Sequence, residues 1–338
     1  MPYSQGAAAP LAFLPHTITM EDTLLHLWQH LGWPLLRLLI LLAFGLLAAL
    51  LIESLGWTSR LAVIARPLTR FARLSPTAGA SFALCFVSGM AANTMLAEAH
   101  DQQRLSRREL ILANLFNSLP SNFQHLPTTF FIAAPLIKSA AVVYIGLTLA
   151  AALFRTLCIA LVSRYILPAN NTEAPGDVPP RPANPFQSAL RNTGKRFKRR
   201  MRKIASYTVP IYILFYLLGE AGFFSGAERF MSQHLGWLAW LTPQAISILT
   251  FQLAAEFTAG LAVAGSLLAN GTMQPQEIVL VLLIGNLLSA PIRAIRHQYP
   301  YYAGIFKPAL AARLILYSQG FRAVSIALVA LLYALWIH

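Results

Sequence analysis

Two stretches of the sequence place amide, hydroxyl and basic side chains beside prolines within otherwise apolar segments. The first stretch surrounds Pro120 and Pro127, and the second surrounds Pro291. A proline inside an apolar helix frees a backbone carbonyl, and in lipid such groups are tolerated only where they are buried in protein or line a water-filled cavity. The candidate side chains are Asn114, Asn117, Ser118, Ser121, Asn122, Gln124 and His125 in the first stretch and Asn286, Ser289, Arg293, Arg296 and His297 in the second.

These residue types suit reversible binding better than covalent chemistry. Amides and hydroxyls offer neutral hydrogen bonds, and Arg293, Arg296 and His297 would favour an anionic ligand if they lie within the membrane. The alternative is structural, because Asn and Ser also bridge helices and the basic residues can be ordinary charge at a helix end. We prefer a binding site, because the polar groups gather at matched positions of the two stretches. Asn93, in the small-residue segment 88–93, is a further candidate.

A carboxylate in an apolar run points to ion coupling. Glu256 lies near the centre of such a run, where the ionised form is costly unless it is paired. We expect it to carry a coupling charge, with an internal ion pair to an Arg as the alternative. Cys85 and Cys158 lie in separate runs, and no Walker, zinc-protease or nucleophile motif occurs. We therefore expect neither an enzyme nor a bound metal or cofactor.

Membrane-spanning helices must hold these side chains, because the composition excludes an ordinary soluble domain. Of the 338 residues, 57% are hydrophobic and 11% are charged, whereas a soluble chain carries about a quarter charged residues. Two apolar runs, 110–135 and 278–308, are broken. The net charge of +14 indicates basic cytoplasmic loops rather than nucleic-acid binding. Runs long enough to span a bilayer lie at 34–54, 77–97, 139–163, 204–224, 244–269 and 314–336.

The two halves of the chain resemble each other in sequence. Short matches recur in the same order at nearly constant spacing, each at the same place in the hydropathy pattern. Unrelated helices with similar ends are the alternative. The matched segments are 53–57 against 220–223, 72–76 against 239–243, 109–111 against 277–279, 117–120 against 286–291, and Pro135 and Tyr144 against Pro308 and Tyr317.

Charge asymmetry predicts that the two copies point in opposite directions. Arg60, Arg66 and Arg70 place the loop after the first span in the cytoplasm, whereas the matching loop 225–242 has little basic charge. Opposite orientations require an odd number of crossings per copy. We therefore expect an all-α integral membrane protein of two inverted repeats, each with about three spanning helices plus a broken or re-entrant helical hairpin. The expected bends are at 118–122 and 285–291, with both termini outside the cell.

A linker separates the two copies. Residues 165–203 are rich in proline and then strongly basic, which predicts a flexible cytoplasmic linker followed by an amphipathic or interfacial helix. We expect the basic part to touch anionic lipid headgroups, with RNA binding the less favoured alternative. The expected division is an N-terminal extension with an interfacial helix, a first repeat, the linker and a second repeat. Their bounds are 1–32, 33–164, 165–203 and 204–338.

The pattern resembles a known membrane domain. The segment ending at Trp57, the basic stretch closing with residues 74–76, the run 88–93 and residues 105–109 before a broken helix are similar to the Gate, or "nucleoside recognition", family. That family includes spore-maturation membrane proteins and the permease core of the ferrous-iron transporter FeoB, in which two gate units form an inverted repeat. The resemblance implies a permease-like fold. The Gly-Cys metal motif of the iron permeases is missing, because Ala91 and Ala92 follow Gly89 and Met90, which puts iron transport in doubt.

These observations favour a secondary permease of the plasma, or inner, membrane. Its solute would be small and polar or anionic, nucleoside-like molecules included, and would bind near the midplane between the two broken helices. A lipid or polyprenyl-phosphate flippase and a non-transporting membrane scaffold or maturation-complex partner are the alternatives. The expected partners are the lipid bilayer and a small-molecule or lipid substrate, with no nucleic acid and with homo-oligomerisation left open.

Overall fold

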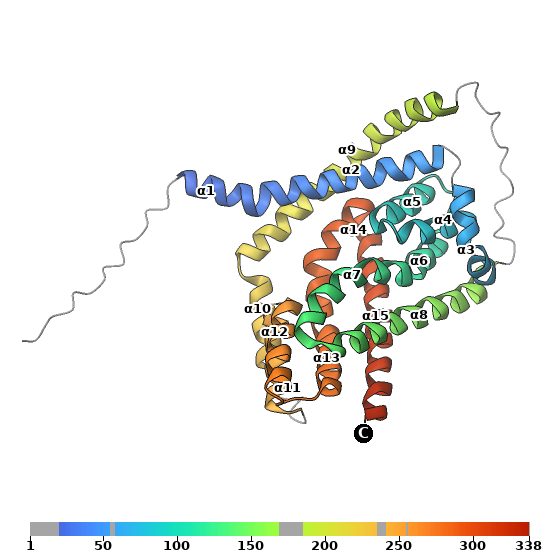
Figure 1. Cartoon of the computed structure of the whole chain (residues 1–338). Coiled ribbons are helices and arrows are strands. Elements are labelled where there is room, and N and C mark those ends of the chain that lie inside the picture. The colour runs from blue at the N-terminus through green and yellow to red at the C-terminus, as the bar shows by residue number, and fades with distance from the viewer. Residues whose placement is uncertain (1–19, 55–57, 169–184, 235–240, 255, 338) are drawn as a thin grey trace, which may run out of the picture.

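The described part of the chain is entirely helical. The computed structural model describes residues 20–54, 58–168, 185–234, 241–254 and 256–337 (Figure 1). The first half contains α1 (Met20–Leu27), a π-helical turn η1 (Trp28–Gly32), α2 (Trp33–Ser54), α3 (Thr58–Ala72), α4 (Pro76–Cys85), α5 (Gly89–Asp101), α6 (Arg107–Phe116), α7 (Ser118–Ile137) and α8 (Ser139–Ile166). The second half contains α9 (Pro185–Glu220), α10 (Phe223–Gln233), α11 (Pro243–Ala254), α12 (Glu256–Ala269), α13 (Pro275–Arg293), a π-helical segment η3 (Ala294–Gln298), α14 (Tyr299–Ile305) and α15 (Pro308–Ile337).

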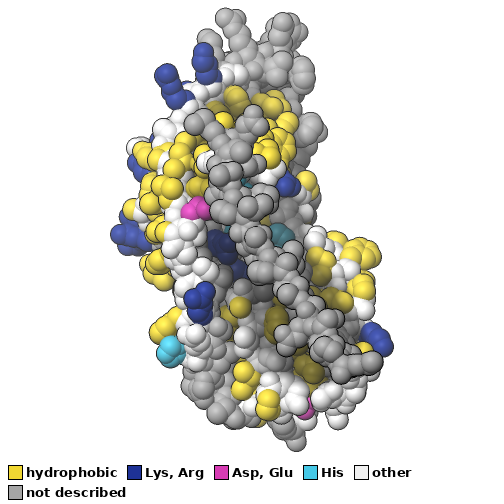
Figure 2. All heavy atoms as spheres, turned by 90° about the vertical axis from the view of Figure 1, so that its left-hand side faces the viewer, with side chains coloured by type: hydrophobic (Ala, Val, Ile, Leu, Met, Phe, Trp, Pro, Cys, Tyr) yellow, Lys and Arg dark blue, Asp and Glu magenta, His cyan; other side chains and the backbone are white. Residues whose placement is uncertain are grey.

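Four of these helices are long and apolar enough to cross a membrane. They cover Thr23–Ala48, Ser139–Ile166, Pro275–Ile305 and Pro308–Ile337. Large hydrophobic side chains remain exposed along them, among them Phe44, Leu316 and Trp336. In water, such exposed apolar surface would favour aggregation. Figure 2 shows hydrophobic side chains over much of the described surface on one face. The chain is therefore an α-helical membrane protein that places these side chains in lipid.

Two of the expected spans are not single helices. The run 77–97 is divided between α4 and α5, and the run 244–269 between α11 and α12, and the members of each pair pack against each other. In the first pair the cause is local, because the Ser88 hydroxyl accepts a hydrogen bond from the Ala91 amide at 3.1 Å and starts a new helix. The expectation of one span over 77–97 was therefore wrong.

The broken segments also differ from expectation. In the first half the helix is interrupted at Asn117, next to the expected bend, and again at Lys138, which has a φ of 49°. In the second half α13 continues through Pro291 and widens into η3, so the expected bend at 285–291 is wrong. Continuing the helix satisfies more backbone groups in lipid than breaking it would. The interruption comes instead at Phe306, before α15.

The basic part of the linker is helical and continues into the second half. Residues 169–184 lie outside the described part, but α9 runs without a break from Pro185 through the boundary expected at 203. The apolar run 204–224 is mostly the C-terminal portion of this helix. At the N-terminus, residues 1–19 are not described, and α1 continues through η1 into α2 rather than forming a separate interfacial helix.

The last helix of each half contributes side chains to two hydrophobic cores. Residues near the start of α8 join the core around α11 to α13, whereas residues near its end join the core around α3 to α6. α15 does the reverse, since Leu314 packs in the core around α3 to α6 and Tyr333 in the other. α8 and α15 therefore run in opposite senses between the two cores, as an inverted repeat predicts. The symmetry itself stays a prediction.

Candidate functional site

A central cavity of about 650 Å³ is lined from both halves of the chain. Its walls come from α5, α6, α7 and α8 of the first half and from α13, α14 and α15 of the second. The sequence-predicted residues that line it are Asn93, Asn114, Asn117, Ser118, Ser121, Asn122, Gln124, His125, Asn286 and Arg293.

Three predicted residues do not line this cavity. Ser289 is buried and donates a hydrogen bond to the Gly285 carbonyl at 2.7 Å, as a helical serine does. Arg296 and His297 are exposed on η3. The next residue of η3, Gln298, does line the cavity, so Arg296 and His297 lie on another side of the same helical segment.

Asn286 organises one end of the cavity. Its amide nitrogen donates to the Tyr144 hydroxyl at 3.2 Å, and its amide oxygen accepts from Arg293 at 2.7 Å and from Arg322 at 3.2 Å. Arg155, on α8, donates to the Ser325 hydroxyl at 2.6 Å. We call Arg155, Arg293 and Arg322 around Asn286 the cationic pole.

The other end is neutral. Asn114 donates to the Asn93 amide oxygen at 2.8 Å, and Asn93 donates to the Tyr301 hydroxyl at 3.1 Å. Asn117 donates to the Ser81 hydroxyl at 2.9 Å. In each of these contacts the asparagine donates through its amide nitrogen. We call Asn93, Asn114 and Asn117 the amide pole. Within the described part of the chain, the buried amide oxygens of Asn114 and Asn117 have no hydrogen-bond partner.

Unpaired buried acceptors are unusual and costly, which makes them candidates for ligand contacts. Asn114 is 7% exposed and Asn117 is 4% exposed, and both line the cavity. The amide nitrogen of Asn122 is a third buried group without a partner. Among the described residues, the amide pole therefore has two acceptors without a partner, and Asn122 beside it has one such donor.

The cavity has a basic electrostatic character. None of its described lining residues is Asp or Glu. Arg155 and Arg322 lie close enough to repel each other, and the partners given above for both are neutral. An arrangement of guanidinium groups with neutral partners in a low-dielectric site attracts anions.

Sequence reasoning missed several lining residues. Arg155 and Arg322 each lie inside a run taken as a span, where a charged residue is a candidate for function by the same rule that was applied to Glu256. Tyr144 was noted only as a repeat match. Tyr301 and Tyr302 carried no signal, because only the packing of α14 against the first half brings them to Asn93 and Asn114.

Glu256 begins α12, but its side chain lies outside the described part of the structure. Within the described residues, no group of three or more His, Cys, Asp and Glu side chains lies together as a metal site would require.

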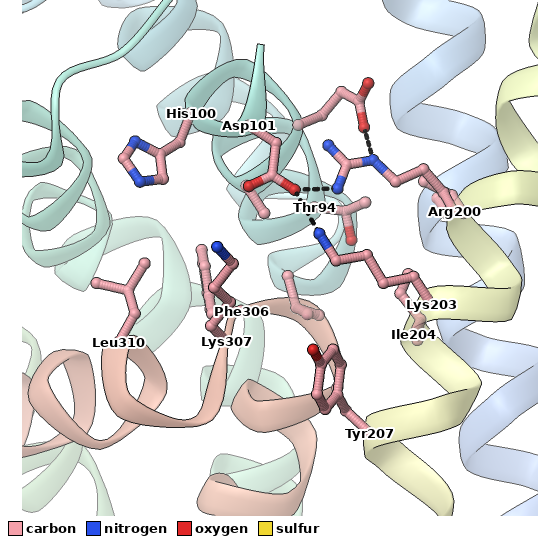
Figure 3. A pocket seen from close by; sticks show the side chains of 15 residues that line it. Thr94, His100, Asp101, Arg200, Lys203, Ile204, Tyr207, Phe306, Lys307 and Leu310 are labelled. Carbon is pink, nitrogen blue, oxygen red and sulfur yellow. Dashed lines mark hydrogen bonds and ion pairs between the residues drawn. The ribbon is translucent and has the colours of Figure 1, made fainter. Parts of the chain in front are cut away.

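A second charged site lies between α5 and α9, where Arg200 and Lys203 point toward Asp101 (Figure 3). Glu98 pairs with Arg196 at 2.8 Å and with Arg200 at 2.5 Å. Asp101 pairs with Arg200 and, at 3.3 Å, with Lys203. We call these five residues the ion-pair cluster. Part of the basic segment expected to touch lipid is therefore bound to carboxylates of the protein itself.

These carboxyl groups lie outside the four membrane-spanning helices. Burial opposes ionisation of Glu98, but hydrogen bonds and attraction to Arg196 and Arg200 outweigh it and hold the pKa of the carboxyl below its ordinary value. Burial likewise opposes ionisation of Asp101, and its contacts with Arg200 and Lys203 lower its pKa overall. Both groups are therefore carboxylates at neutral pH.

Comparison with known proteins finds relatives that match more than three quarters of this chain. An uncharacterized protein of Methanocaldococcus jannaschii is 28% identical over 270 residues, which cover 78% of this chain and 82% of the relative. Two further uncharacterized proteins of that organism are 23% and 21% identical, covering 77% and 80% of this chain and 81% and 88% of the relatives. No family model and no solved structure matches the chain. Matches of this length include parts of both halves.

Proposed function

We propose that the chain is a secondary permease that moves a small polar or anionic solute through the central cavity. The observation that carries the proposal is that Asn117 of the first half and Asn286 of the second line the same cavity. A site built at the interface of two halves suits alternating exposure to the two sides of a membrane. The volume of about 650 Å³ lies within the range of small-molecule sites.

The fold supplies elements that an alternating mechanism needs. α8 and α15 run in opposite senses between the two cores. α5 carries Asn93 at the cavity and Glu98 in the ion-pair cluster, so one helix connects the site to a contact with α9. We place this cluster on the cytoplasmic side by the positive-inside rule. It closes that side when formed and opens it when α5 separates from α9.

Flux in proteoliposomes tests the proposal. We expect labelled uridine, glycerol 3-phosphate or another small polar solute to enter faster than into empty liposomes. Asn286→Ala should reduce apparent affinity about 5- to 100-fold, because a lost buried partner costs about 1–3 kcal/mol. Arg313→Gln, an exposed change on α15, is the matched control. Solute entry at the leak rate across a panel of nucleosides, sugars, organic acids and phosphate esters would reject a permease.

Coupling is tested at Glu256. If this residue carries a coupling charge, Glu256→Gln should abolish the dependence of flux on a pH or sodium gradient while leaving folded protein in the membrane. Flux with an unchanged gradient dependence would remove Glu256 from the mechanism. A folding defect would indicate the structural ion pair instead.

The exposed face of α9 favours contact with anionic lipid. Lys198, Arg199 and Arg202 are exposed there, apart from the ion-pair cluster, and a basic helix face attracts anionic headgroups. Replacing all three by Gln should weaken binding to vesicles containing phosphatidylglycerol and leave flux intact. Loss of cellular function with flux retained would favour the scaffold alternative, and movement of labelled polyprenyl phosphate or phospholipid would favour the flippase.

A further inference from the structure

The two ends of the cavity differ in what they leave unsatisfied. At the cationic pole, the charged guanidinium groups of Arg155 and Arg322 donate to neutral partners. At the amide pole, the amide oxygens of Asn114 and Asn117 are neutral acceptors without a partner among the described residues. A ligand that satisfies both ends must be anionic at one end and must carry hydroxyl or N–H donors at the other.

The cationic pole suits a doubly charged oxyanion. A guanidinium has five N–H donors. The bonds identified here use one donor of Arg155, to Ser325, and one of Arg322, to Asn286. Arg155 is 8% exposed, so its charge is held in a low dielectric without a described carboxylate beside it. Arg155 and Arg322 together balance an oxyanion of charge about −2, and their planar donor forks fit phosphate oxygens. Arg293, the third arginine of the pole, donates to both the backbone carbonyl and the amide oxygen of Asn286.

The described lining argues against other classes of anion. A zwitterionic amino acid needs an acceptor of negative charge for its ammonium group, and no described lining residue is Asp or Glu. A monocarboxylate would neutralise only one of the two guanidinium groups. A phosphate monoester carries a charge of about −1.5 to −2 at neutral pH and three acceptor oxygens.

We propose that the substrate of the central cavity is a phosphate monoester with a hydroxyl- or N–H-bearing organic part. Arg155 and Arg322 bind the phosphate, and the free amide oxygens of Asn114 and Asn117 accept hydrogen bonds from the organic part. This substrate class presupposes the permease proposed above. The phosphate can belong to a soluble ester or to the headgroup of a lysolipid, which share this chemistry.

Calorimetric binding to the purified full chain in detergent tests the assignment without requiring transport. The probes are glycerol 3-phosphate, hexanoyl lysophosphatidic acid, inorganic phosphate and uridine. We expect glycerol 3-phosphate to bind more tightly than inorganic phosphate, because only the ester reaches both poles. Tighter binding of the lysolipid than of glycerol 3-phosphate would assign the same chemistry to a lipid source, and the reverse order to a soluble source.

Variants separate the two poles. Arg322→Gln should weaken glycerol 3-phosphate and inorganic phosphate alike by about 10- to 100-fold, the loss of a charge-assisted hydrogen bond. Asn117→Ala should weaken glycerol 3-phosphate about 5- to 10-fold and leave inorganic phosphate unchanged. Arg313→Gln, exposed on the same helix as Arg322, should change neither. Arg322→Lys keeps the charge and should show an intermediate loss if Arg322→Gln does not fold.

The outcomes also separate this inference from the proposed function. Tight uridine binding that is insensitive to Arg322→Gln, with uridine flux in proteoliposomes, would overturn the phosphate ester and leave the permease standing. Equal loss for the ester and for inorganic phosphate in Asn117→Ala would overturn the role of the amide pole. Phosphate-ester binding with the expected variant pattern but no flux would keep the ligand class and reject transport.

Discussion

The ion-pair cluster and the cationic pole both bury arginine, but they satisfy its charge in opposite ways. Arg200 lies between the carboxylates of Glu98 and Asp101. Arg322 donates instead to the neutral amide of Asn286. Burying a charge costs several kcal/mol unless it is paired. In the cluster, carboxylates of the protein therefore compensate the arginine charge. In the cavity, a bound anion would have to compensate it.

This difference separates an arginine that holds helices together from one that binds a solute. The cluster joins α5 of the first half to α9 of the second. The cationic pole gathers side chains of α8, α13 and α15 around one asparagine. Removing a carboxylate from the ion-pair cluster should consequently lower the free energy of unfolding. Removing an arginine from the cationic pole should leave it level or raise it.

The largest expected effect is at Glu98. Glu98→Gln leaves Arg196 and Arg200 beside a neutral amide at a site where Glu98 is only 6% exposed, and breaking such a buried pair costs about 3–5 kcal/mol. Thermal unfolding in detergent should show a clear fall in melting temperature. Lys203→Gln is the graded control: because Lys203 is 45% exposed, its pair should contribute less than about 1 kcal/mol. An equal fall in melting temperature for Glu98→Gln and Lys203→Gln would show that burial of the ion pair does not set its contribution to stability.

A smaller effect should follow acidification. The pKa values of Glu98 and Asp101 lie below their ordinary values in the folded protein. The ion pairs therefore add stability that is fully present above the ordinary carboxyl pKa of about 4. This stability is lost as pH falls below that value and through the lowered pKa values.

Unfolding followed between neutral pH and pH 3 measures this loss. The variant carrying both Glu98→Gln and Asp101→Asn should be less stable at neutral pH and should lose less on acidification. A double variant with the same acid sensitivity as the unchanged protein would locate the titrating groups elsewhere.

The smallest expected change in stability, and the one of opposite sign, is at the cavity. Arg155→Met removes a buried charge whose partner, Ser325, also donates to the Arg322 carbonyl at 2.9 Å and so keeps a hydrogen bond. The free energy of unfolding should stay level or rise by about 1 kcal/mol, while anion binding falls. Arg313→Met on α15, exposed to the surroundings, should change neither property. A loss as large as that of Glu98→Gln would show that Arg155 is structural.

Much of the candidate site could be predicted from sequence, because its residues differ in type from their immediate neighbours in the chain. Asn114, Asn117 and Asn286 stand out as amides beside prolines in apolar runs, and all three line the cavity. The interruption of the first broken segment was also placed within a residue or two of Asn117. Pro291 misled the interpretation, because a proline within a helix permits either a break or a continuation, and the neighbouring helices decide which one satisfies the backbone.

The sequence by itself determined that the chain is helical, that it enters a membrane and which amides are unusual there. Each of these depends on composition, on hydropathy or on a residue's immediate neighbours. Only the tertiary structure decided that Arg155 and Arg322 face one cavity and that Tyr301 reaches Asn93. α8 and α15 are apolar nearly all round, so no periodic pattern marks the side that faces the protein. Which side chains meet is then set by contacts between segments far apart in the chain.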